Sequence, residues 1–182
     1  MLAREPAPAA SPRWVSGAWW RTRLVLDGRV VRHPGPALWL QDGDCYVDLR
    51  GPGPSPLDGP RVFAGTTSWS APHLRWHHVS DSAFGDHADI GRLARRGDET
   101  LVETGVVRTG LGSVSYRERW ERVATSSAVT IEQRGTAFVV RTDRPLLLEL
   151  RIGGRGRPPT SSDLSPHARS HNPIPRAAKE QP

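Results

Sequence analysis

The segment 114–120 combines residue types suited to acid–base chemistry or to holding the polar end of a ligand. Alternate side chains of an extended strand point to the same side, so Tyr116, Glu118 and Trp120 share one face. That face is the more apolar one, which favours an inward orientation and a buried Glu118. Burial raises the pKa of a carboxyl unless a cation or hydrogen-bond donors offset it. Glu118 and Tyr116 are therefore the candidate catalytic acid and base.

Two acidic residues each have a second interpretation. Glu118 has a simpler role as the structural partner of an inward arginine, for which Arg50 and Arg151 are the candidates. Glu103 either pairs with Arg92 across neighbouring strands on the outer surface, or points inward and joins Glu118 in a polar lining. A second arginine–glutamate pair on the same face favours the outer surface, and the inward alternative stays open.

A second candidate lining lies in the segment 37–50. Alternation places an aromatic pair, Trp39 and Tyr46, on the same side as Asp48 and Arg50. Arg50 could bind a carboxylate or phosphate through both guanidinium nitrogens, with Asp48 orienting it. The alternative is an inert stripe on the exterior. The full candidate ligand-binding set is Trp39, Tyr46, Arg50, Thr66, Glu103, Tyr116, Glu118 and Trp120.

Metal and cofactor chemistry has little support in the sequence. His77 and His78 are adjacent in an extended segment, so their side chains point to opposite faces and cannot share a metal ion. His78 lies on the more apolar face and is a weak candidate for the axial ligand of a haem; the alternative is a hydrogen-bonded core histidine. Cys45, the only cysteine, excludes an internal disulfide and is predicted to be a small core residue. We expect no metal and no cofactor.

Period-two alternation recurs along the chain, whereas no long segment sustains the 3.6-residue period of a helix. The alternating segments are 19–26, 37–41, 45–50, 62–69, 73–80, 89–96, 99–107, 113–122, 128–133, 136–142 and 146–152. Short links join them, which is typical of an antiparallel meander. A sheet of this length closes into a barrel or folds into a sandwich to remove its edges. The sequence therefore predicts an all-β fold, a single up-and-down antiparallel barrel of about 8–11 strands.

Three two-residue joints predict the register of the hairpins, because pairing runs outward from each turn. The joints are Asp42-Gly43, Gly97-Asp98 and Arg134-Gly135. The pairs that they predict include Leu40 with Cys45, Arg92 with Glu103, and Ile131 with Phe138. Each hairpin then has one apolar and one mixed face, and which of the two lines the interior is left open.

Composition bounds the domain organisation. The chain has 182 residues, which suits one domain, predicted at 14–152. The segments 1–13 and 153–182 are rich in Pro, Gly, Ser and Ala and are predicted to be disordered tails. The formal net charge is +6, but much of it lies in the tails, so we do not expect nucleic-acid binding. No apolar run is long enough to span a membrane, and we expect a soluble, cytoplasmic protein.

Three segments resemble one protein family: FAGT (63–66), LVETG (101–105) and SVSYRERW (113–120). Their order resembles a fungal family of calycin-like barrel proteins, named for interacting with a casein-kinase-type protein kinase. The resemblance covers roughly 62–152 and implies a lipocalin-like barrel without an assigned activity. Those proteins resemble two barrels in tandem, with Phe in place of Tyr116 and an apolar residue in place of Arg119. We therefore expect a single-barrel, bacterial relative and carry over no kinase partnership.

The opening Gly17-Ala18-Trp19 fits the G-x-W motif of lipocalins. The motif implies that an arginine of the last strand closes one barrel end over Trp19. Arg151, in the last alternating segment, is the candidate for that arginine.

The leading functional hypothesis is non-catalytic binding of a small, largely apolar or amphipathic ligand with one polar end. Glu118, Tyr116 and Arg50 would hold the polar end, and some of the seven tryptophans would line the cavity. The first alternative is a small-barrel enzyme of the cyclase, isomerase or hydratase type that uses Glu118 and Tyr116. The second is an interaction module with a solid core, whose tails recruit an unknown protein partner.

Overall fold

A computed structural model describes residues 9–55, 57–59, 61–81, 89–109, 112–123, 128–135, 137–142 and 150–152. The regular elements within these ranges are β-strands and one short 3-10 helix, so the predicted all-β class is confirmed. They are η1 (Arg13–Val15), β1 (Gly17–Leu26), β2 (Arg29–Val30), β3 (Ala37–Asp42), β4 (Cys45–Arg50), β5 (Arg61–Ser70), β6 (His73–Asp81), β7 (Asp89–Arg95), β8 (Thr100–Thr109), β9 (Gly112–Arg122), β10 (Val129–Arg134), β11 (Ala137–Thr142) and β12 (Leu150–Ile152).

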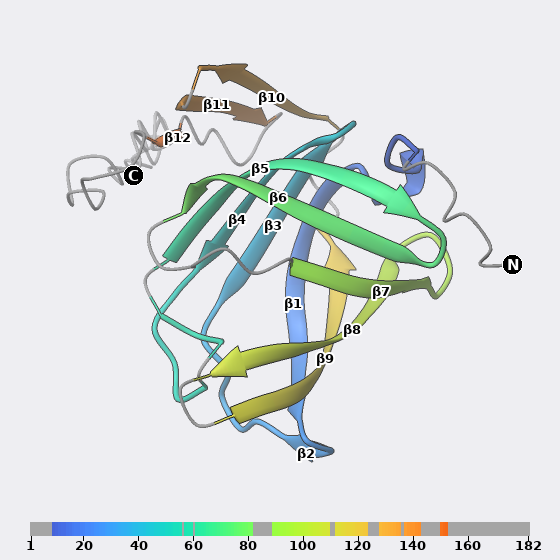
Figure 1. Cartoon of the computed structure of the whole chain (residues 1–182), viewed down its shortest axis with the longest axis vertical. Helices are drawn as coiled ribbons and strands as arrows, with labels where there is room; N and C mark the ends of the chain where they lie inside the picture. The colour runs from blue at the N-terminus through green and yellow to red at the C-terminus, as the bar shows by residue number, and fades with distance from the viewer. Residues whose placement is uncertain are drawn as a thin grey trace, which may run out of the picture.

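Eight strands form a closed antiparallel barrel (Figure 1). The order is β1-β3-β4-β5-β6-β7-β8-β9, and β9 pairs back with β1, while the short β2 adds to the edge of β1. Apart from the short β2, strands that follow one another along the barrel are neighbours in it, which is the predicted up-and-down connectivity. Closure satisfies the backbone groups that an open edge would leave unpaired.

The last three strands lie outside the barrel. β10, β11 and β12 form a separate antiparallel sheet next to the β3–β5 wall (Figure 1), and Ile131 pairs with Val140 instead of the predicted Phe138. An apolar cluster joins this sheet to the barrel wall. Its buried members are Ala18, Leu38, Leu40, Val47, Ala64, Ile131, Phe138 and Val140. The apolar face of the β3–β4 hairpin is therefore covered from outside, and the mixed face lines the barrel interior.

The β3–β4 turn lies one residue later than predicted. Leu40 pairs with Val47 rather than Cys45, because Asp42 ends β3 instead of entering the turn. Its carboxylate accepts a hydrogen bond of 3.0 Å from the backbone N–H of Ile131, on the second sheet. A register shift of two residues keeps every side chain on its predicted face.

The β7–β8 hairpin shifts by one residue, with a larger consequence. Glu103 pairs with Leu93, not with Arg92, because the chain reverses through a longer loop at 96–99. A one-residue slip moves a strand's side chains to the opposite face. The predicted Arg92–Glu103 surface pair is therefore wrong, and Glu103 lies inside the barrel with 5% of its surface exposed.

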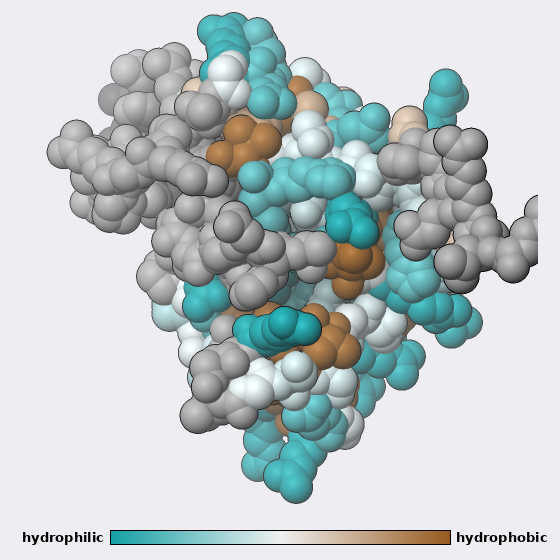
Figure 2. All heavy atoms as spheres, in the orientation of Figure 1, coloured by the Kyte–Doolittle hydropathy of each residue, from teal (hydrophilic) through white to brown (hydrophobic). Residues whose placement is uncertain are grey.

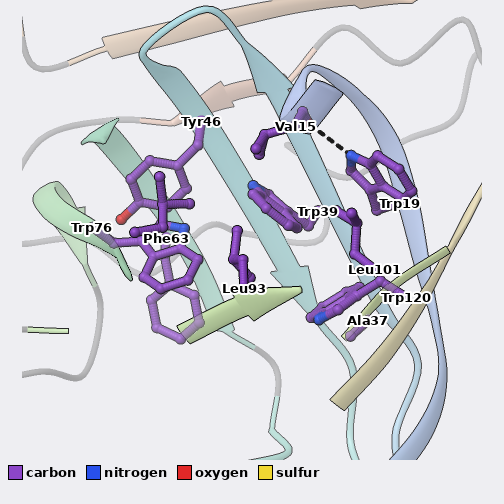
Figure 3. Packing of buried hydrophobic residues seen from close by; sticks show 11 residues of the cluster. Val15, Trp19, Ala37, Trp39, Tyr46, Phe63, Trp76, Leu93, Leu101 and Trp120 are labelled. Carbon is purple, nitrogen blue, oxygen red and sulfur yellow. Dashed lines mark hydrogen bonds between the residues drawn. The ribbon is translucent and has the colours of Figure 1, made fainter. Parts of the chain in front are cut away.

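The barrel interior is packed with side chains from η1 and from all eight barrel strands (Figure 3). The fully covered members include Trp19, Trp39 and Trp120. In Figure 3, Tyr46, Phe63 and Trp76 lie on one side of Trp39 and Trp19 lies on the other, with Val15 above. Trp39 contacts Trp76 and Trp120 edge to face, at 5.9 Å between ring centroids in each case.

Part of the predicted N-terminal tail is ordered. Ala9 exchanges two backbone hydrogen bonds of 2.9 Å with Trp69, and the N–H of Ser11 donates to the carboxylate of Asp44. The prediction of a disordered 1–13 is thus wrong from residue 9 onward. Residues 1–8 and the predicted tail 153–182 lie outside the described residues.

An arginine does cover Trp19, but it is Arg122 and not Arg151. The Arg122 guanidinium lies 4.2 Å above the Trp19 ring and donates to the backbone oxygens of Ser16 and Trp14. Arg122 ends β9, which is the last strand of the barrel, whereas Arg151 pairs with Val139 in the second sheet. The predicted motif is present with a different arginine.

We expect Arg122→Met to lower the free energy of unfolding by about 2 kcal/mol, because it removes a cation–π contact and two charged hydrogen bonds. Urea unfolding followed by tryptophan fluorescence measures this change. Arg117→Met is the matched control, since Arg117 is exposed on the outer face of the same strand and should change stability by less than about 0.5 kcal/mol. Equal stability of the two variants would contradict the role of Arg122.

Candidate functional site

A cavity of about 370 Å³ lies inside the barrel, at the end away from η1. It is formed where β8 ends and β9 begins, together with parts of β3 to β7. The aromatic side chains that line it are Trp39, Tyr46, Phe63, Trp76 and Tyr116, and the acidic and basic ones include Asp48, Arg50, Glu103 and Glu118. Val106, which is 63% exposed, marks the opening to solvent. Six of the eight predicted ligand-binding residues line the cavity, and a seventh, Trp120, lies just beneath the lining.

A chain of alternating charges crosses the floor of the cavity. Glu118 accepts hydrogen bonds from Arg21 at 2.7 Å and from Arg50 at 2.9 Å through the same oxygen, Oε1. Arg21 also pairs with Asp58 at 2.5 Å, and Arg50 pairs with Asp48 at 2.9 Å. The order is therefore Asp58–Arg21–Glu118–Arg50–Asp48. Glu118 is fully buried, as predicted, and its bonds fit the structural interpretation with Arg50 as partner.

Electrostatics hold Asp58 and Arg50 of this ion chain in their charged forms. Burial disfavours charge on Asp58, but backbone N–H groups of Gly35 and Ser55, together with Arg21, lower the pKa of its carboxyl. Burial likewise opposes charge on Arg50, yet the neighbouring carboxylates keep its pKa above the usual value.

Arg21 is the main functional-site residue that the sequence reasoning missed. A signal was available, because alternation from Trp19 places Arg21 on the same face of β1. Asp58 lies in the loop between β4 and β5, where no periodicity applies, so only the folded chain shows its position.

Glu103 is the second buried acid of the cavity. Its Oε1 accepts a hydrogen bond of 2.7 Å from the Tyr116 hydroxyl, and its Oε2 accepts one of 3.1 Å from Trp120 Nε1. Burial, and then the charge of Glu118 directly opposite on β9, raise the pKa of Glu103 to about 8. Burial and the charge of Glu103 also raise the pKa of Tyr116, which keeps its hydroxyl protonated as a donor.

The hydrogen bond between Tyr116 and Glu103 depends on the glycine at position 105. A Cβ at position 105 would lie 2.6 Å from the hydroxyl oxygen of Tyr116, so any side chain there would displace the ring. With glycine, the Tyr116 ring lies across the neighbouring strand and its hydroxyl reaches Glu103. The segments 101–105 and 113–120 thus form one hydrogen-bonded cluster.

His78 faces the cavity, on the predicted side of β6. Its Nδ1 is 2.9 Å from the Tyr46 hydroxyl and its Nε2 is 3.3 Å from Asp89. Both ring nitrogens therefore have protein partners, which is the arrangement of the hydrogen-bonded histidine. No group of three or more His, Cys, Asp or Glu residues within the described ranges is arranged to hold a metal ion.

The remaining predicted residues have the following positions. Trp39 lines the cavity and donates from Nε1 to the side-chain oxygen of Gln41 at 3.0 Å. Thr66 does not line the cavity, so its assignment to the ligand-binding set has no geometric support. Cys45 is a partly buried free thiol at the apolar cluster between the sheets, and burial raises its pKa. A raised pKa disfavours the thiolate, which agrees with the predicted core role.

The fold and this site together define the class of protein, which is a closed eight-stranded β-barrel with an internal cavity. No protein-family model, curated protein or solved structure matches the chain. The resemblance to the fungal barrel family stays a prediction. Across the described ranges, no helix is long and apolar enough to cross a membrane.

Proposed function

We propose that this protein binds a small molecule in the cavity of its barrel. The observation that carries the proposal is the 370 Å³ cavity itself, which has aromatic walls and buried polar groups on its floor. Small-molecule sites in proteins start at about 300 Å³ and combine mostly apolar walls with a few placed polar groups.

The two kinds of lining have different roles in this proposal. Trp39, Phe63 and Trp76 offer rings that bury the apolar body of a ligand. Glu103 and Tyr116 offer a buried carboxyl and hydroxyl that bind its polar end. Glu118, which the sequence reasoning put at the centre, supports the floor through its two arginines.

The barrel supports binding better than it supports a purely structural interaction module. An interaction module needs no internal cavity, and a filled interior would have favoured that reading. On the face shown in Figure 2, the apolar side chains of the described residues form small areas separated by hydrophilic ones. Such a face lacks the broad apolar patch that marks many protein interfaces.

We expect Val107→Trp to weaken binding at least tenfold, because Val107 lines the cavity and the larger ring fills part of it. The probe is 1-aminoanthracene, a neutral aromatic amine whose fluorescence increases in apolar surroundings. Native mass spectrometry of protein purified without denaturant tests in parallel for a co-purified molecule.

Val102→Trp is the matched control, because Val102 lies on the outer face of the same strand and should leave probe binding unchanged. The proposal fails if the wild-type protein binds no probe and carries no extra mass. It also fails if both variants bind the probe as the wild type does.

One observation favours a second candidate, an enzyme that uses acid–base chemistry in the same cavity. A carboxyl with a pKa of about 8, hydrogen-bonded to a tyrosine, can donate or accept a proton near neutral pH. The acid would then be Glu103 rather than the predicted Glu118, which two arginines hold. An enzyme would differ from a binding protein by consuming the molecule that enters the cavity.

A further inference from the structure

The charges around the cavity do not cancel. The ion chain contains three carboxylates, on Asp48, Asp58 and Glu118, but only two guanidinium groups. Both guanidinium groups already contact two carboxylates each. The ion chain therefore has an excess negative charge, and Arg50 acts on Glu103 only through its more distant charge, without forming an ion pair with it.

Glu103 adds another acid beside this excess. It stands directly opposite Glu118 on the neighbouring strand, and its two hydrogen-bond donors, Tyr116 and Trp120, are neutral. Within the described ranges, no arginine, lysine or histidine lies within ion-pairing distance of Glu103. A buried carboxylate without a cation is costly, so a proton or another cation must compensate for it.

Aromatic rings border the same point. Gly91 lacks a side chain, and a Cβ built there would lie 3.0 Å from both Glu103 Oε1 and the Trp76 ring. Carboxylate and ring therefore meet over this glycine. Trp39 stands at 64° to Trp76, so the two rings form a corner. A cation is attracted by the faces of aromatic rings as well as by a carboxylate.

We propose that the ligand of this cavity is a small organic cation, an amine or quaternary ammonium with an apolar body, whose charged nitrogen pairs with Glu103. This inference rests on the proposed binding function and specifies the chemistry of the ligand. The ammonium takes the place of the proton on Glu103, so the cavity exchanges one positive charge for another. The apolar body packs against Trp39, Trp76 and Phe63.

Proton exchange makes binding depend on pH. Below the pKa of Glu103, about 8, the ammonium must displace a proton, and its affinity falls about tenfold for each unit of pH decrease. The titratable and charged groups that face Glu103 across the cavity are Tyr116 and Glu118 from β9, Asp48 and Arg50 from β4, His78 from β6 and Asp89 from β7. Arg21 lies behind Glu118, and Arg61 and Arg108 line the outer part of the cavity.

The arginines in the outer part of the cavity suggest the alternative that the test must exclude, an anionic ligand. A ligand with a carboxylate would pair with Arg108 and leave Glu103 protonated. Its affinity would then stay level or rise as pH falls. Cationic and anionic ligands thus predict opposite pH profiles.

Three probes of similar size separate these outcomes: 2-phenylethylamine, 2-phenylethanol and phenylacetate. We expect isothermal titration calorimetry at pH 8.5 to show the amine binding at least tenfold more tightly than the alcohol. Between pH 6 and 7.5, amine binding should release close to one proton, measured from the heats in buffers of different ionisation enthalpy.

Glu103→Gln keeps the shape of the side chain and removes its charge, so it should abolish the preference for the amine and flatten the pH profile. Glu121→Gln is the matched control, because Glu121 is on β9 outside the cavity, and it should behave as the wild type does. The proton release is measured on wild-type protein, so the test stands even if Glu103→Gln fails to fold.

The outcomes distinguish this inference from the proposed function. If the alcohol or phenylacetate binds as tightly as the amine or more tightly, the proposal of a cationic ligand is wrong. The proposed function, small-molecule binding in the cavity, is then still supported. Amine binding without proton release also overturns the inference. If none of the three probes binds and 1-aminoanthracene does not bind either, the proposed function fails with it.

Discussion

Replacing Arg21 with methionine is expected to lower the free energy of unfolding by about 3–5 kcal/mol, the cost of breaking a buried ion pair from one side. Arg21 is buried, and it joins Glu118 of β9 to Asp58 of the β4–β5 loop. Its loss leaves Asp58 without a cation and Glu118 with Arg50 alone. Methionine restores much of the volume, so the loss reports on charge rather than on an empty space.

Equilibrium unfolding in urea measures this change, with Arg23→Met as the control. Arg23 is on the same strand but exposed, and its replacement should alter stability by less than about 0.5 kcal/mol. A loss below about 1 kcal/mol for Arg21→Met would show that the ion chain does not hold the floor of the cavity. The cavity would then need another source of rigidity.

The free energy of unfolding is also expected to fall as pH rises from about 5 to 8. The pKa of Glu103 is about 8 in the folded protein and near 4.5 in the unfolded chain, so the folded state binds the extra proton between these values. Stability therefore decreases with pH across this window, by about 1.4 kcal/mol per unit at the steepest. The pKa values of Asp58, Asp27 and Glu132 are lowered, so those groups act below this window.

Glu103→Gln should remove this slope and make the protein more stable than the wild type above pH 8. Thermal or urea unfolding at several pH values between 5 and 9 measures both effects. A wild-type stability that is level or rises across the window would show that Glu103 is ionised in the folded protein. In that case the cavity already compensates for its charge.

For the strands that form the site, the sequence predicted which side chains share a face better than it predicted which residues pair between neighbouring strands. Alternation correctly grouped Glu118 with Tyr116 and Trp120 on one face, and Asp48 with Arg50 on another, because side-chain direction in a strand depends only on residue parity. The two-residue error in the β3–β4 register left these faces intact.

Glu103 could not be placed by the same reasoning. Its face depends on how many residues form the β7–β8 loop, and a change of one residue moves the side chain from surface to interior. The Gly97-Asp98 pair favoured a tight turn, but the folded chain uses a longer one. The difference decides between a weak surface ion pair and the buried acid on which our proposals rest.

The sequence by itself determined the up-and-down connectivity of the barrel and the alternation of the two faces of its strands. These are local properties, set by period-two patterning and by short links between strands. Only the tertiary structure decided that the mixed face of β3–β4 is the inside of the barrel, because a second sheet covers the apolar face from outside. It also decided the partners of the buried charges, Arg21 with Glu118 and Asp58, since those pairs join segments far apart in the chain and no local pattern encodes their distance.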